Sequence, residues 1–428
     1  MKSEIENIKA RQVFDSRGNP TVEVDVFSKN NFARASIPSG ASTGKHEAVE
    51  LRDGGSVLMG KGVEKVIGII ENEIKSHLIG LNVFDQEKID SKMCEIDGTS
   101  NKSLVGANSI LPISLAVSRL AASIKGLDLY EYLSLYCSFS SFNTLPVPLM
   151  NILNGGSHAD NLVDIQEFMI APIGANSFKE SLIMGVEVFH HLKSVLKLKG
   201  LSTNVGDEGG FAPNLKTNKE ALDLILLAIE KAGYVPGDDI LLAIDAASSE
   251  FYQDGNYVFN SGEILSSNDM INFWKNWTKK YPIFSIEDGL HEDDWKGWSS
   301  LTKEIGDYVQ LVGDDLYVTN IERLNKGIKE YASNSILIKP NQIGSLTETF
   351  NTMSLARKNN FTTVMSHRSG ETEDTFISDL AVAFSCSQIK TGSCSRSDRV
   401  AKYNQLLRIE EKLASKALFS GKKFKYSK

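Results

Sequence analysis

The sequence predicts an α/β protein in which a barrel of parallel strands follows a smaller α+β domain. Short apolar runs rich in Ile, Leu and Val recur in the second half of the chain, and each ends on a charged residue. These charged ends lie 22 to 42 residues apart, which leaves room for a crossover helix between successive strands. The length of 428 residues accommodates both a barrel and a second domain.

Composition and charge narrow the class of protein. With 41% hydrophobic and 23% charged residues, the chain has the composition of a soluble globular protein. The net charge of −8 argues against a general nucleic-acid binder, which needs an excess of Lys and Arg. We expect a cytoplasmic protein, because residues 1–18 lack the apolar core of a signal peptide and no membrane-spanning apolar run is evident. The four cysteines lack metal or redox spacing and are interpreted as reduced thiols.

The first domain is predicted over residues 1–137 as a sheet followed by helices. Val22, Val24 and Val26 alternate with acidic residues, a pattern typical of a half-buried strand, and a turn separates them from a second strand over residues 32–37. Strands followed by helices without alternation describe an α+β domain. Apolar residues at helical spacing predict helices over residues 63–78, 89–96, 110–124 and 128–136.

A loop of seven small residues, 38–44 (PSGASTG), lies between the sheet and these helices. It contains two glycines and no apolar side chain that would anchor it. One interpretation is an exposed turn. The other is a mobile lid that closes over a ligand.

The barrel domain, residues 138–428, is predicted to open irregularly. A strand is expected over residues 147–152, and a second strand is expected to end near residue 170. Two consecutive helices follow, whose starts are marked by Ser177 and Thr217, each with a Glu three residues later in a capping-box spacing. A standard barrel alternates strand and helix, so this opening is a departure.

Six later apolar runs are interpreted as buried parallel strands. The carboxyl ends of parallel barrel strands meet at one mouth, where barrel enzymes carry their chemistry. Charged residues would therefore converge at this mouth. They are Asp245, Glu287, Asp314, Lys339, Arg368 and Lys390.

Three of these residues, Asp245, Glu287 and Asp314, are acids. An acid after a strand is often only the N-cap of the next helix. Three carboxylates at one mouth, however, would repel one another unless a cation lay between them. An oxygen-only ligand set without Cys or His suits magnesium.

The basic residues suggest proton transfer and anion recognition. A lysine in a barrel mouth is costly unless it is paired or chemically used, and a salt-bridged or snorkelling lysine is the structural alternative. Near a divalent cation and a second lysine such as Lys390, the pKa of Lys339 is expected to fall toward a value useful for proton abstraction. Arg368, Ser369 and Lys390 together offer the groups that recognise phosphate or carboxylate.

Three further candidates lie in the irregular opening of the barrel. Glu208 has glycines on both sides, which lets the backbone approach a ligand closely, although an ordinary turn acid is the alternative. Glu167 and His158 follow the two early strands. They are either structural or part of the same site.

The sequence resembles the enolase family, of the bacterial type, nearly from end to end. The matching stretches are VFDSRGNPTVEV, PSGASTGKHEA, GANSILPISLAVSR, NGGSHADNLVDIQEFMI, VGDEGGFAPN, AIDAASSEFY, SIEDGL, LVGDDLYVTN, LIKPNQIGSL, MSHRSGETEDTFISDLAV and QIKTGSCSRSDRVAKYNQLLRIEE. The resemblance implies a small N-terminal domain on a modified (β/α)8 TIM barrel that opens strand-strand-helix-helix.

The resemblance also implies an activity, the reversible dehydration of 2-phospho-D-glycerate to phosphoenolpyruvate. Lys339 matches the base that removes the C2 proton, and Glu208 matches the acid that assists departure of the C3 hydroxyl. The remaining matches are substrate-contacting or supporting positions, namely His158, Gln166, Glu167, Arg368, Ser369 and Lys390.

Two Mg²⁺ ions per active site are implied in the same way. Asp245, Glu287 and Asp314 match the ligands of the first ion, and Ser42 matches the lid residue associated with the second. The chain departs from the family pattern next to the matched base, where Pro340 replaces a larger apolar residue.

The resemblance implies a homodimer without a membrane span. Two alternatives to the glycolytic hydro-lyase stay open: another superfamily member that acts on a different acid, and a surface or scaffold protein. Enolases are associated with plasminogen and with RNA-degradation partners, which would place a secondary pool at the cell surface or outside the cell. The basic end, residues 422–428, would suit plasminogen but is more typical of a solvated terminus.

Overall fold

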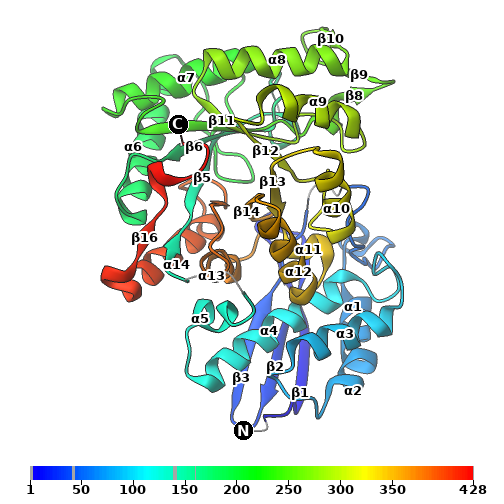
Figure 1. Cartoon of the computed structure of the whole chain (residues 1–428). Coiled ribbons are helices and arrows are strands. Elements are labelled where there is room, and N and C mark those ends of the chain that lie inside the picture. The colour runs from blue at the N-terminus through cyan, green and yellow to red at the C-terminus, as the bar shows by residue number, and fades with distance from the viewer. Residues whose placement is uncertain (1–2, 41–43, 138–141, 160, 428) are drawn as a thin grey trace.

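In this computed structural model, residues 3–40, 44–137, 142–159 and 161–427 are described. The smaller N-terminal domain, blue to cyan in Figure 1, lies against one side of a larger barrel coloured green to red. The predicted fold class, an α+β domain followed by a modified barrel, is confirmed. The predicted domain boundary at residue 138 and the predicted ligand Ser42 lie outside the described residues.

The N-terminal domain is built on an antiparallel sheet of β1 (Asn7–Phe14), β2 (Pro20–Ser28) and β3 (Asn31–Ser36). Val22, Val24 and Val26 are completely buried, as their alternation with acids predicted. The helices α3 (Gln86–Asp97), α4 (Ala107–Lys125) and α5 (Leu129–Ser134) confirm the predicted ones. The first predicted helix is continuous but passes from α1 (Glu64–Ile69) through a π turn (Ile70–Ile74) into α2 (Lys75–Leu78).

Helix α4 bears on the expectation that no apolar run is long enough to cross a membrane. In the described part of the chain, α4 alone meets the length and composition of a membrane span, with a mean hydropathy of 1.3. However, 83% of that window is buried, because α4 packs against β2 and β3. It is therefore the core helix of its domain, and Pro112 lies inside it without ending it.

The barrel closes with eight strands. Seven of them run parallel to one another, and β6 is antiparallel to both of its neighbours. Around the barrel, the strands are β5 (Val147–Asn154), β6 (Glu167–Pro172), β7 (Ile240–Asp245), β11 (Ile283–Glu287), β12 (Gln310–Gly313), β13 (Ser335–Ile338), β14 (Thr362–Ser366) and β15 (Gln388–Lys390).

The place of Glu167 relative to its strand was predicted wrongly. The second strand ends near residue 170 as expected, but Glu167 begins β6 instead of following a strand. No α-helix crosses between β5 and β6, so their short connection returns the chain antiparallel. Glu167 therefore reaches the mouth from the start of its strand, where it pairs in register with Asp245 of β7.

Helices surround the barrel in the predicted order (Figure 1). The side chains of Ser177 and Thr217 accept hydrogen bonds from the backbone N–H of Glu180 and Glu220, which confirms both predicted caps. The helices are α6 (Phe178–Leu198), α7 (Asn218–Lys231), α8 (Ser267–Lys280), α9 (Trp295–Ile305), α10 (Ile321–Glu330), α11 (Pro340–Ile343), α12 (Leu346–Lys358), α13 (Phe376–Ala383) and α14 (Ser397–Leu413). Smaller pairings join β4 (Thr144–Leu145) to β16 (Leu418–Phe419), and β8 (Tyr252–Gln253) to β9 (Asn256–Val258) and β10 (Ile264–Leu265).

The barrel interior is a packed apolar core that includes the end of the chain. Phe424 and Tyr426 are buried in the same cluster as barrel side chains such as Leu337 and Val364. The expectation of a solvated terminus is therefore only partly right, since Lys422, Lys423 and Lys425 are exposed while these aromatic side chains are not.

A buried acid of the N-terminal domain, Asp90, contacts the barrel domain. Asp90 of α3 accepts hydrogen bonds from the backbone N–H (2.9 Å) and the hydroxyl (2.6 Å) of Thr347, in the first turn of α12. The N-terminal domain thus caps a barrel helix that lies between two site-bearing strands, β13 and β14. Burial raises the pKa of Asp90 to about 6.

The stability of this contact should depend on pH. The folded protein binds the Asp90 proton more tightly than the unfolded chain, so this group's stabilising contribution is full below about pH 4 and is lost as pH rises through 6. Asp90→Asn cannot ionise, so its unfolding free energy relative to wild type should rise by roughly 2–3 kcal/mol between pH 4 and pH 8. Urea unfolding measures this difference, with the exposed Asp238→Asn as control. A difference that does not change with pH would contradict the assignment.

Candidate active site

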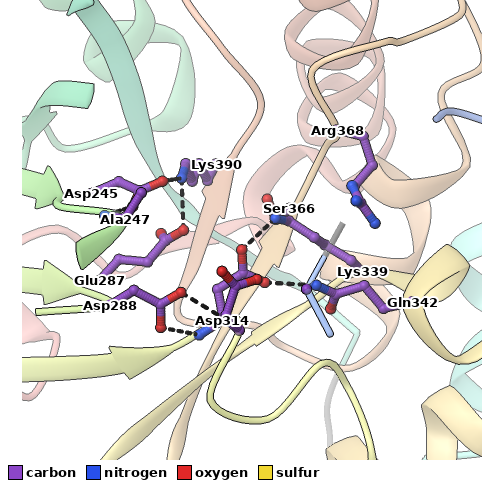
Figure 2. Close-up of polar contacts among 12 residues, drawn as sticks. Asp245, Ala247, Glu287, Asp288, Asp314, Lys339, Gln342, Ser366, Arg368 and Lys390 are labelled. Atoms are coloured by element: carbon purple, nitrogen blue, oxygen red, sulfur yellow. Dashed lines mark hydrogen bonds and ion pairs between the residues drawn. The ribbon is translucent and has the colours of Figure 1, made fainter. Parts of the chain in front are cut away.

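The predicted residues meet at the mouth formed by the carboxyl ends of the parallel barrel strands. Asp245 and Glu287 end β7 and β11, Asp314 follows β12, and Lys339 follows β13. Figure 2 shows these side chains pointing toward one another. The predicted residues that line the common cavity are His158, Gln166, Glu167, Glu208, Asp245, Asp314, Lys339, Arg368, Ser369 and Lys390.

Lys390 joins the acids of three neighbouring strands. Its Nζ lies 2.7 Å from Asp245, 2.8 Å from Glu287 and 3.2 Å from Glu167. Burial alone would lower the pKa of Lys390, but these acids raise it well above its ordinary value. Lys390 is therefore a charged counter-ion, and Glu287 belongs to the site through this contact although it does not line the cavity.

Lys339 donates to Asp314 with an Nζ–Oδ2 distance of 2.5 Å. The expected fall in the pKa of Lys339 depends on a nearby divalent cation and stays a prediction. In the protein by itself, burial and the charges of Arg368 and Lys390 lower the pKa of Lys339, but the acids around it, with Asp314 first and Glu287 after it, raise the pKa above its ordinary value. Gln342 donates to the other oxygen of Asp314 at 2.8 Å, so this carboxylate is fixed from both sides (Figure 2).

The acidic cluster is larger than predicted. Asp288 accepts from the backbone N–H groups of Asp314 (3.0 Å) and Asp315 (2.8 Å). Burial and the charges of Asp315 and Asp314 raise the pKa of Asp288 well above its ordinary value, which shows how crowded these carboxylates are.

A bound cation would offset the repulsion between these crowded carboxylates. Oxygen atoms of Asp288, Asp314 and Asp315 lie within 4.8 Å of one another, whereas the predicted set of Asp245, Glu287 and Asp314 is bound to the two lysines instead. All of these donors are carboxylate oxygens, the ligand type that magnesium prefers. The residues present therefore fit a hard divalent cation.

A second acidic pair lies beside the same cavity. Glu208 is buried and accepts from Asn151 Nδ2 at 3.0 Å. Burial would raise the pKa of Glu208, but His367 and His158 lower it well below its ordinary value. Burial and the charge of Glu208 raise the pKa of Glu167 well above its ordinary value. The pKa values of these two neighbouring buried carboxyl groups are therefore shifted in opposite directions.

The glycines around Glu208 permit its position. A Cβ at Gly209, whose φ is +84°, would lie 2.5 Å from the carbonyl oxygen of Ser395, and one at Gly210 would lie 2.5 Å from Asn154 Oδ1. The glycines therefore let this backbone lie close to other parts of the protein, whereas its predicted approach to a ligand stays a prediction.

The anion-recognition residues are held by the N-terminal domain. Arg368 donates to both oxygens of Glu47, at 2.8 and 3.2 Å, and to Asn341 at 3.2 Å. Ser369 Oγ accepts from Arg17 at 3.4 Å. Both domains therefore build the site, and Glu47 binds the guanidinium that an anionic ligand would use.

Gln166 and His158 flank the acids from the β5–β6 connection. Gln166 donates to Asp245 at 3.3 Å and accepts from Ser157 at 2.8 Å. His158 Nδ1 lies 3.7 Å from Glu167 and 3.8 Å from Glu208. The predicted site residues that the structure describes are thus brought together.

Sequence reasoning missed five residues of this site. Asp288 and Asp315 directly follow predicted acids, so the doublets Glu-Asp and Asp-Asp were an available signal. His367 directly precedes Arg368 and was equally visible. No local signal marked Glu47 or Arg399, because each reaches the site from a distant segment.

Pro340 does not disturb the end of β13. It is the first residue of α11, where a missing N–H costs nothing because that group has no partner within the helix. The backbone N–H of Lys339 donates to Thr319 Oγ1 at 2.9 Å, which fixes the strand end independently of Pro340.

Together, the fold and the site define a barrel enzyme whose mouth combines acid–base groups with a carboxylate site for a divalent cation. The chain matches two protein-family models. "Enolase, N-terminal domain" covers residues 5–133, and "Enolase, C-terminal TIM barrel domain" covers residues 142–428. The chain belongs to the enolase family, whose members are magnesium-dependent hydro-lyases.

Proposed function

We propose that this protein reversibly dehydrates 2-phospho-D-glycerate to phosphoenolpyruvate. The observation that carries the proposal is the placement of Lys339 and Glu208 on one cavity, with Arg368 and Ser369 lining it as well. The cavity thus combines a base, an acid and anion-binding groups. That combination suits removal of a C2 proton and a C3 hydroxyl from a phosphorylated acid.

Lys339 is the proposed base for the C2 proton. It can accept a proton only after losing its own, and Asp314 opposes that loss. Asp314 would oppose that loss less strongly if it also held a divalent cation. Lys390, bound by three acids, stays protonated and supplies fixed positive charge near the reacting carbon.

Glu208 is the proposed acid for the C3 hydroxyl. The proton it donates would be held by the Glu167–Glu208 pair, in which burial and the charge of Glu208 raise the pKa of Glu167. Asn151 fixes the orientation of the carboxyl group through Glu208 Oε2.

Two magnesium ions are proposed, the first bound by Asp245, Glu287 and Asp314 and the second near Ser42. When bound, they supply the positive charge that makes a proton next to a carboxylate acidic enough to remove. Asp288 and Asp315, adjacent to two of these ligands, add to the negative potential that attracts a cation.

Replacing a ligand acid should weaken magnesium binding. Asp245→Asn and Asp314→Asn keep the side-chain volume but remove an anionic ligand, so each is expected to lower magnesium affinity by roughly 100-fold or more. Isothermal titration calorimetry measures the affinity, and the exposed Asp238→Asn serves as the control. Unchanged affinity in both site variants would remove these acids from the metal site.

The second candidate function is that of a superfamily member acting on a different acid. Arg368 and Ser369 favour a phosphorylated substrate, because a guanidinium fork and a hydroxyl suit a phosphate group.

We also propose that the protein acts in the cytoplasm as a homodimer.

A comparison of 2-phosphoglycerate with D-glycerate separates the two candidates. The two acids differ only in the phosphate, so a site built to bind phosphate should show a kcat/KM for glycerate roughly 10⁴-fold lower. Proton NMR of each mixture with magnesium follows both reactions. Comparable turnover of glycerate would favour the other superfamily activity.

A further inference from the structure

Arg399 lies next to the proposed active site and contacts two of the loops that build it. Its side chain is completely buried near the start of α14. One guanidinium nitrogen donates to the carbonyl oxygen of Arg368 at 2.6 Å, and the other donates to those of Ser369 at 2.7 Å and Asp207 at 3.1 Å. It therefore ties the loop that follows β14 to the loop that carries Glu208.

The same guanidinium contacts a histidine ring. Arg399 Nη1 lies 2.5 Å from His367 Nδ1. A guanidinium in a protein only donates hydrogen bonds, so His367 Nδ1 must be the acceptor and cannot carry a proton. The opposite tautomer would place two N–H donors against each other in a buried site, which is costly.

The other ring nitrogen faces the acid. His367 Nε2 lies 3.5 Å from Glu208 Oε2, and His367 lines the cavity. Burial, together with the charges of Arg399 and Lys390, lowers the pKa of His367 to about 3, although Glu208 raises it. The ring is therefore neutral and carries one proton, for which Nε2 is the remaining position.

We propose that Arg399 is a positioning residue that fixes His367 as a neutral Nε2–H donor facing Glu208. His367 then orients Glu208 but takes no proton during the reaction, because its free nitrogen is blocked by Arg399. The position of the ring proton follows from the contact between Arg399 and His367 Nδ1. The catalytic consequence rests on the proposed dehydration.

Nitrogen NMR tests the ring proton directly. The chain has seven histidines, and in the ¹⁵N-histidine-labelled full-length protein the signal lost in His367→Gln identifies His367. The expected spectrum shows a protonated Nε2 and an unprotonated Nδ1 at all values from pH 5 to pH 9. A protonated Nδ1, or a doubly protonated ring in that range, would overturn the proposal. This result does not depend on whether 2-phosphoglycerate is the substrate.

Arg399→Lys tests the consequence. Lysine keeps the charge but loses the planar fork, so the ring should populate both tautomers, and kcat for 2-phosphoglycerate should fall roughly 10- to 100-fold with KM within about threefold. Arg357→Lys is the matched control, an exposed arginine that also donates to a carbonyl oxygen, that of Phe384. A folded Arg399→Lys protein with unchanged tautomer and kcat would refute the positioning role. If this variant does not fold, the wild-type spectrum decides alone.

Discussion

Replacing Lys339 with alanine is expected to abolish both exchange of the C2 hydrogen of 2-phosphoglycerate with deuterated water and formation of phosphoenolpyruvate. Alanine cannot accept the C2 proton, and loss of a positioned base typically costs roughly 10²–10⁴-fold in rate. Both steps fail together because the C2 proton leaves first in a stepwise elimination. Deuterium incorporation measured by NMR and product measured by absorbance report the two steps separately.

The control is Lys329→Ala, at an exposed position on α10. This variant should keep both exchange and product formation at wild-type levels. Persistent C2 exchange in Lys339→Ala, with the fold intact by circular dichroism, would assign the base to another residue.

Replacing Glu208 with glutamine is expected to separate the two steps. Lys339 and the carboxylates at the ends of β7, β11 and β12 are untouched, so C2 exchange should continue within about tenfold of the wild-type rate. Product formation should fall roughly 10²–10⁴-fold, because the amide cannot donate a proton to the departing hydroxyl. The same NMR and absorbance measurements apply, with the exposed Glu230→Gln as the matched control.

The reverse outcome would be decisive. If Glu208→Gln stops C2 exchange while Lys339→Ala permits it, the roles of acid and base are exchanged. Loss of exchange in both variants would show that Glu208 also positions the substrate.

Most of the fold could be predicted because local patterns determine it. Buried parallel strands gave apolar runs ending on Asp245, Glu287 or Asp314, and the N-cap residues Ser177 and Thr217 marked two helix starts. The direction of β6 could not be predicted from its own residues. It depends on the connection from β5, which lacks a crossover helix.

The sequence predicted which residues belong to the site, but not which of them contact one another. The charged strand ends and the family motifs identified the residues, whereas the contacts depend on distant segments. Arg368 is bound by Glu47, which lies 321 residues earlier. Nor does the sequence show that Asp314 lies close enough to Lys339 to raise its pKa. Such balances between burial and neighbouring charges are decided by distances that a linear sequence does not contain.

Incubation of the purified wild-type chain with 2-phosphoglycerate and magnesium tests the proposed dehydration most directly. The predicted result is a rise in ultraviolet absorbance from the enol double bond of phosphoenolpyruvate, which stops when a chelator removes the magnesium and resumes when magnesium is restored. No rise in absorbance from a folded, magnesium-binding protein would contradict the proposed function.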